Sequence, residues 1–312
     1  MPTVSGIVKD SSGTPCEALV RVLRRDNMSL VANVFSDPST GAYSVTTADT
    51  SPHVVERYVA PIGDKNALYR RLGLHMSGAN NSTAITDTYG HSVTVVGDAK
   101  IDAVTTDPYG GTSGILTLDG SGDQLTLASS TDFDIRTNGV SDFTIRFKFK
   151  TSQTTAYATL MSREWGGSPP NNGMTIFLRN SASGPLSCWM TGYSTGSPIL
   201  TGTTTTHGDN NWHDFEWSCS GNVHTMRLDG VQEATTTSSA VQTSASKILV
   251  IGNDPTFGGG ARAYNGKIKD IEILVGKALH TANFTPPAST FIDYVIGTPT
   301  ENAQIFDNVI PV

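Results

Sequence analysis

The sequence contains little cysteine, little charge and no long apolar run. Its 312 residues include three cysteines, and no two of them form a C-x-x-C pair. This spacing excludes a disulfide framework and a cysteine-based zinc or redox site. No run of about 18 apolar residues occurs, so we expect no transmembrane helix and no membrane insertion. The first residues lack a basic segment followed by an apolar one, so we expect no secretory leader.

The charge balance excludes one class of partner. Charged residues make up 16% of the chain, against about 25% in typical soluble domains. The net charge is −7 and the sequence pI is about 5.4. Because binding to a phosphate backbone needs clustered positive charge, we expect no nucleic-acid partner. Apolar residues, at 37%, suffice for a packed core.

A two-residue period dominates the chain and predicts an all-β fold. Apolar residues occupy every odd position from Phe143 to Phe149, so we expect Arg146 and Lys148 to face water. The segment 213–219 repeats this alternation, which places Asp214 and Glu216 on the face opposite Phe215 and Trp217. Turn signals such as Asp119-Gly120 and Asp229-Gly230 separate the short β-rich runs. No long stretch shows the 3.6-residue spacing of a helix.

Composition and turn spacing predict four parts of the chain. Residues 1–62 hold about five short strands at ~10-residue spacing, which is typical of a small sandwich. A turn-like linker over 63–72 precedes a larger sandwich over 73–287. The tail, 288–312, is too apolar for a solvated end, so we expect it to dock on its own chain or on a neighbour.

Catalytic patterns are nearly absent. A glycanase needs two carboxylates ~5–10 Å apart, and none of the seven glutamates starts the E-x-D-x-x-E strand pattern. Asp214 and Glu216 share a strand face and stay open as a dyad, although a solvated outer face is the favoured interpretation. Neither a G-x-S-x-G elbow nor an H-E-x-x-H helix motif occurs. We therefore expect a protein that is not an enzyme.

Sugar binding is the best ligand hypothesis from the residues alone. Glycan sites stack a sugar on an aromatic ring and bind its hydroxyls with Asn, Asp or backbone groups. The loop around Trp165, Asn171 and Asn172 has this composition, and Trp189 and Tyr193 follow on the next strand and loop. Packing of Trp165 on the sheet edge is the alternative.

Three segments, in chain order, resemble the laminin-G-like, concanavalin-A-like jelly-roll family. The first spans residues 114–127, around Asp119-Gly120, and is followed by the D-F-T-I strand at 142–145. The second runs from Trp212-His213 to the L-D-G turn at 228–230, and the third is G-x-I-x-D at 266–270. The resemblance implies a jelly-roll sandwich over 73–287.

The same family resemblance raises a metal question. Some related jelly rolls bind Ca²⁺, which takes 6–8 oxygen ligands. Four aspartates of the first segment are candidate ligands, chiefly Asp119 and Asp123, with Asp132 and Asp134 beyond them. The alternative is that Asp119 and Asp123 cap hairpin turns by accepting backbone N–H bonds. We expect no other cofactor.

The first module resembles a second family. The V-x-G-x-V-x-D run at 4–10 and the T-G-x-Y strand at 40–43 are similar to the transthyretin-like, carboxypeptidase-regulatory-like module, an Ig-like sandwich. The lead-in at 73–78, with Asp87 and the strand 93–96, is similar to the start of jelly rolls in virion proteins of tailed bacteriophages. The combination implies a virion surface protein made in the host bacterial cytoplasm.

These resemblances imply a role and its alternatives. We expect a capsid decoration (cement) protein that displays a lectin-like domain, contacts other virion proteins and cell-surface glycans, and is homo-oligomeric or lattice-bound. A tail-associated receptor binder, a glycan depolymerase using Asp214 and Glu216, and a free lectin stay open. The adjacent pairs Arg24-Arg25 and Arg70-Arg71 are candidates for anchoring to an acidic virion surface, with ordinary solvated charge as the alternative.

Overall fold

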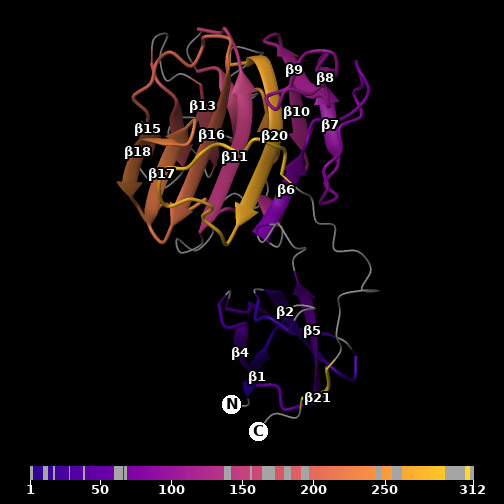
Figure 1. The fold of residues 1–312 in the computed structure, drawn as a ribbon. Coiled ribbons are helices and arrows are strands. Elements are labelled where there is room, and N and C mark those ends of the chain that lie inside the picture. Colours follow the sequence, from indigo (N-terminus) through magenta and orange to yellow (C-terminus); the bar gives the residue numbers. More distant parts are fainter. Residues whose placement is uncertain are drawn as a thin grey trace. The chain divides into compact units, whose positions relative to one another are not determined.

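The computed structural model divides the chain into two compact units. One unit joins Met1–Leu68 to Ile292–Val312, and the other is Tyr69–Phe291. The structure describes residues 3–9, 13–16, 18–27, 29–37, 39–59, 66, 69–136, 142–154, 157–163, 173–178, 184–190, 197–242, 247–254, 262–291 and 306–309. Within these residues there is no α-helix, so the all-β prediction is confirmed (Figure 1). Among them no helix has the length and apolar character needed to cross a membrane.

The smaller unit packs two antiparallel sheets over a core of valines. One sheet pairs β1 (Thr3–Ile7) with β4 (Ala42–Thr46). The other has the order β21-β5-β2-β3, with bounds Phe306–Val309, His53–Val59, Ala18–Arg24 and Leu30–Phe35. The C-terminal strand β21 therefore extends a sheet built from the first 59 residues. Both sheets contribute to one buried cluster, Val4, Val8, Ala18, Val20, Val22, Val45 and Val55.

A glycine fixes the turn that leads into β4. Gly41 has φ +66°, and a Cβ there would lie 2.1 Å from the Val8 carbonyl oxygen. Only glycine tolerates both the left-handed backbone and this close approach. The Asp37 carboxylate accepts the Ser39 and Thr40 amides at 2.9 and 2.8 Å and holds the preceding residues in place.

The larger unit is a two-sheet jelly roll. Its seven-stranded sheet has the order β15-β14-β13-β12-β19-β10-β7. The strand bounds are Leu200–Thr201, Ser187–Met190, Met174–Phe177, Thr159–Arg163, Leu249–Ile251, Gln124–Leu127 and Val93–Val96. The eight-stranded sheet has the order β18-β17-β16-β11-β20-β9-β8, with β6 also paired to β20. Its bounds are Val231–Thr237, Val223–Leu228, Trp212–Ser220, Phe143–Lys150, Asn265–Val275, Ile115–Asp119, Lys100–Asp102 and Arg70–Leu74.

The inner faces of the two sheets form one hydrophobic core. Phe143 packs edge-on against Trp217 at 5.4 Å, and Phe147 stacks on Phe215 at 4.8 Å. These residues are the odd positions of β11 and β16, so the period-two prediction is confirmed for the core face. Cys188 and Met226, on opposite sheets, lie with their sulfurs 3.6 Å apart.

One predicted boundary differs from the structure. Strand β6 begins at Arg70, within the stretch 63–72 that the sequence assigns to a linker, because it pairs with β20 of the jelly roll. Strand β6 begins with two arginines, and its partner β20 lies about 200 residues away, so the local sequence did not indicate a strand of the jelly roll.

Candidate functional site

The outer face of the seven-stranded sheet carries hydroxyl and aromatic side chains. Alternation turns Thr126, Ser162, Thr175 and Trp189 away from the core, in one register row across β10, β12, β13 and β14 with Val250 of β19 between them. Neither Asp nor Glu occurs in any of the seven strands. These strands therefore supply no carboxylate pair for glycoside hydrolysis.

An aromatic and arginine cluster occupies one end of this face. The Phe177 ring lies 5.6 Å from the Tyr157 ring and 6.4 Å from the Trp189 ring, edge-on to both. The Arg262 guanidinium lies 5.0 Å from the Tyr157 ring centroid and 5.1 Å from that of Phe177. Asp254 is 3.8 Å from Arg262 Nη1. Phe177 is buried, Trp189 is half-buried and Tyr157 is 40% exposed, so the Tyr157 ring is the part of the cluster most open to solvent.

Tyr157 adopts a backbone conformation that bulky residues avoid. Its φ is +59°, in the left-handed region. The Tyr157 carbonyl accepts the Thr159 hydroxyl at 3.2 Å, and the Thr159 amide bonds the Arg262 carbonyl at 2.8 Å, so strand β12 holds both cluster residues. Strain of this kind, about 1–3 kcal/mol, concentrates at functional sites.

The outer face of the eight-stranded sheet carries buried charges, contrary to expectation. Glu272 binds Arg70 at 2.6 Å and also binds Arg146. Glu216 lies 3.1 Å from Arg227, and Asp214 lies 2.7 Å from Lys148. All three carboxylates are buried, so the interpretation of Asp214 and Glu216 as a solvated face is wrong.

A covering segment, residues 277–291, explains this burial. Its Leu279 amide bonds the Thr144 hydroxyl at 2.9 Å, and its His280 Nδ1 lies 2.6 Å from Glu216. Farther along, Thr290 donates to Asp270 at 2.9 Å, and the Phe291 ring packs on Arg70. Residues 277–291 therefore cover the charged outer face of the eight-stranded sheet.

The covered face leaves little room for a ligand. A cavity of about 10 Å³ lies between the covering segment and the sheet, lined by Tyr109, Lys148, Asp214, Ser289 and others. That volume holds about one water molecule. Burial raises the pKa of Asp214, and Lys148 opposes the shift. Asp214 is thus an ion-paired structural group beside a cavity too small for a sugar ring, and Glu216 is paired with Arg227 and His280.

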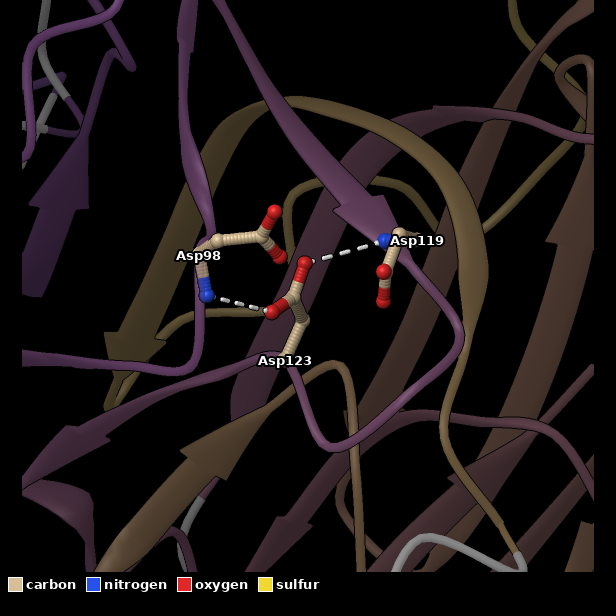
Figure 2. A group of neighbouring side chains, drawn as sticks. All are labelled: Asp98, Asp119 and Asp123. Atoms are coloured by element: carbon tan, nitrogen blue, oxygen red, sulfur yellow. Dashed lines mark hydrogen bonds between the residues drawn. The ribbon is translucent and has the colours of Figure 1, made fainter.

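An acidic cluster forms where the chain crosses between the two sheets (Figure 2). Asp119 ends β9, Asp123 precedes β10, and Asp98 lies in the turn from β7 to β8. One carboxylate oxygen from each residue lies within 4.8 Å of the others. Asp123 accepts the Asp98 amide at 2.8 Å and the Asp119 amide at 3.0 Å, and Asp119 accepts the Ser121 amide at 2.7 Å. The turn-capping interpretation therefore describes both predicted residues.

The cluster could also supply oxygen ligands to Ca²⁺. Burial raises the pKa of Asp123 against the two backbone hydrogen bonds that lower it, and the charge of Asp119 adds a smaller rise. A cation there would relieve the repulsion between these carboxylates. Asp98 is a member that the sequence analysis missed, and only the pairing of β7 with β10 brings it close. Asp132 and Asp134 lie elsewhere, since they bind His91 at 3.1 Å and Arg163 at 2.5 Å.

The predicted glycan residues are only partly described. Trp189 lies on the outer face of the seven-stranded sheet, whereas Trp165, Asn171, Asn172 and Tyr193 lie outside the described residues. The sequence analysis missed Tyr157, Phe177 and Arg262. Alternation within β13 could have placed Phe177 on the outer face, but no periodic signal marks a turn residue such as Tyr157 or Arg262.

The two arginine pairs differ. Arg24 lies 3.4 Å from both Asp26 and Asp49, and Arg25 is exposed. Arg71 is half-buried. Arg70 is buried beneath Phe291 and paired with Glu272, so its prediction as a surface anchor is wrong because the covering segment encloses it.

Comparison with known proteins agrees with this architecture. Residues 119–282, just over half of the chain, match the family profile described as the concanavalin A-like lectin/glucanases superfamily. No curated protein matches the chain.

Solved structures give likeness of fold alone. The binding domain of Paraclostridial Mosquitocidal Protein 1 is similar over 69% of this chain and 51% of its own, with 13% identity and a TM-score of 0.50. Domain 4 of AbnA, a GH43 extracellular arabinanase from Geobacillus stearothermophilus in complex with arabinotriose, is similar over 67% of this chain and 94% of its own, with 16% identity and a TM-score of 0.46. The chain spans about half of the mosquitocidal binding domain. With two packed antiparallel sheets and this profile match, the chain belongs to the concanavalin A-like lectin/glucanases superfamily.

Proposed function

We propose that the protein binds carbohydrate, without hydrolysing it, through the outer face of the seven-stranded sheet. The observation that carries this proposal is the cluster of Tyr157, Trp189 and Arg262 on a face whose strands contain no carboxylate. Aromatic rings with one apolar face and one polar edge suit sugars, which present apolar C–H faces and polar rims. Membership of a lectin-containing superfamily supports the same conclusion.

The absence of hydrolysis is supported by the state of the one predicted dyad. A general acid needs a raised pKa beside a substrate, and its partner needs to reach the reacting carbon or a water. Although burial raises the pKa of Asp214, Asp214 and Glu216 bind Lys148 and Arg227 beneath the covering segment. A depolymerase that used them would have to lift residues 277–291 away first.

The glycan test is binding to an array of bacterial polysaccharides and oligosaccharides. We expect Tyr157→Ala and Trp189→Ala to weaken each positive signal, since each ring removes stacking surface. A matched control is Phe147→Leu, which alters an aromatic ring of the core rather than of the site. New reducing ends from a bound polysaccharide, abolished by Asp214→Asn or Glu216→Gln, would contradict the proposal in favour of a depolymerase.

We infer further that the protein decorates a bacteriophage capsid, with the smaller unit as its anchor. Support comes from the resemblance of residues 73–78 to the start of jelly rolls in tailed-phage virion proteins, and from the exposed Arg25 on the smaller unit. The partners would be other virion proteins, and the assembly a homo-oligomer or a lattice. Arg24 and Arg25 are the arginines proposed to contact an acidic capsid surface.

The placement test is a cryo-electron microscopy reconstruction of the particle. We expect density for the smaller unit against the capsid and for the jelly roll away from it. Density at the tail tip instead would favour receptor binding, and absence of the chain from purified particles would contradict both placements.

A further inference from the structure

We propose that the Tyr157–Arg262 site selects sugars that carry a carboxylate. The inference rests on the proposed carbohydrate binding and names the class of sugar. Three features support it: the accessible charge is the Arg262 guanidinium, two aromatic rings hold that guanidinium, and the strands of this face contain no Asp or Glu.

The accessible charge of the site is positive. In the Arg262–Asp254 pair the carboxylate side chain is fully buried, at 0% exposure, whereas the arginine side chain is 16% exposed. A ligand approaching Tyr157 therefore meets the guanidinium and not the carboxylate. A guanidinium presents its N–H donors in a planar fork that matches a carboxylate, and the 3.8 Å separation from Asp254 is longer than a hydrogen bond.

Two rings hold the guanidinium in place. Arg262 Cζ lies 5.0 Å from the Tyr157 centroid and 5.1 Å from the Phe177 centroid, within the range of cation–π contact. An arginine held in this way loses little rotamer freedom when it binds a planar acid. Burial lowers the pKa of Arg262 and Asp254 opposes the shift, so an additional anion would offset a desolvation cost that the site already carries.

The strands of this face offer a sugar acid no repulsion. None of the seven strands carries Asp or Glu, and the strand neighbours of the cluster, Thr159, Thr175 and Ser187, are buried and uncharged. The Thr175 hydroxyl is buried without a hydrogen-bond partner. By contrast, Asp214, Glu216 and Glu272 all lie on the other sheet. Selectivity of this kind depends on the absence of like charge as much as on attraction.

The experiment uses matched sugar pairs and the full chain. The probes are oligogalacturonate against its carboxyl-reduced form, and sialylated against desialylated N-acetyllactosamine, measured by calorimetry at low and high salt. We expect the acidic member of at least one pair to bind about tenfold more tightly, the value of one charge-assisted hydrogen bond. High salt should reduce that preference, because the arginine is partly exposed.

Three variants assign the effect to residues. Arg262→Gln should reduce the ratio of acidic to neutral sugar affinity to about one, because it removes the positive charge from the site. Arg262→Lys should keep part of the preference, and its unfolding midpoint checks that the fold survives. Tyr157→Ala should weaken both members of the pair, because it removes the stacking surface.

The outcomes separate the two proposals. Equal binding of acidic and neutral sugars would overturn acid selection and leave carbohydrate binding intact. An acid preference that survives Arg262→Gln would overturn the assignment to this site. Failure to bind any sugar in the array or in these pairs would overturn the proposed function, and this inference with it.

Discussion

The outer faces of the two jelly-roll sheets carry different side chains, although in both sheets alternate strand residues point away from the core. The outer face of the seven-stranded sheet carries aromatic rings and hydroxyls, of which those of Ser162 and Thr175 are buried, and no strand of this sheet holds a carboxylate. The eight-stranded sheet presents buried ion pairs centred on Asp214, Glu216 and Glu272, beneath residues 277–291. A polar position in a strand is therefore no proof of solvent exposure. The ion-paired face supports the fold, and the face whose strands lack carboxylates is the one that we propose binds a ligand.

The largest expected effect on stability is that of Glu272→Ala, which tests whether the charged face supports the fold. The substitution leaves Arg70 buried without its carboxylate, and Arg146 loses the anion that raises the pKa of its guanidinium against the cost of burial. We expect a loss of ~3–5 kcal/mol in the free energy of unfolding, measured by urea titration. A loss below about 1 kcal/mol would show that the charged face behaves as an ordinary surface.

Acid should destabilise the eight-stranded sheet. Burial, followed by the charge of Arg136, lowers the pKa of His224 in β17 to about 4. An unfolded histidine titrates near 6.5, so its contribution is complete above about pH 6.5 and is lost as pH falls towards 4. At about 1.4 kcal/mol per pKa unit, the loss is roughly 3 kcal/mol.

The matched variant for the acid effect is His224→Phe. We expect its urea midpoint to change less than that of the wild type between pH 7 and pH 4.5. The strands of the seven-stranded sheet carry no histidine or carboxylate, so they should add nothing to the slope. If the urea midpoint of the variant falls as much as that of the wild type between pH 7 and pH 4.5, groups other than His224 cause the acid effect.

The crossing between the sheets should depend on Asp123. Asp123→Ala removes the acceptor for the Asp98 and Asp119 amides, and we expect a loss of ~1–2 kcal/mol. The measurement is thermal unfolding in EDTA and in calcium chloride. Equal losses in both media fit turn capping, whereas stabilisation of the wild type by calcium that Asp119→Asn abolishes would show a cation site.

Backbone strain at Tyr157 gives a test that separates stability from binding. Tyr157→Gly and Tyr157→Ala both remove the ring, but only glycine accepts φ +59° without cost. We expect the glycine variant to be more stable than the alanine variant by about 1 kcal/mol, with sugar binding weakened in both. Equal stability would mean that the turn relaxes on substitution.

The smallest expected change in stability is at Thr175, in the centre of the outer face of the seven-stranded sheet. Thr175→Val keeps the side-chain shape and removes a buried hydroxyl that has no hydrogen-bond partner. We expect a gain of up to about 1 kcal/mol in unfolding free energy. A loss instead would reveal a partner for this hydroxyl.

Sequence periodicity predicted the strands and their core residues better than it predicted which side chains distant segments cover. Strand β11 has the bounds that alternation gives, because each of its odd residues enters the core. Burial of Asp214 depends on residues more than 70 positions away in the chain, and a local pattern holds no information on that distance. Asp98 and Arg262 likewise join their clusters through strand pairing and a turn, where no period exists.

The pairing of β21 with β5 has a mechanical consequence. Because β1 and β21 belong to the same small unit but to different sheets, a force that pulls these two strands apart acts on the valine core between the sheets and on the pairings with β4 and β5. The residues of the jelly roll lie between β1 and β21 in the sequence. Pulling on β1 and β21 would therefore open the smaller unit before it loaded the jelly roll.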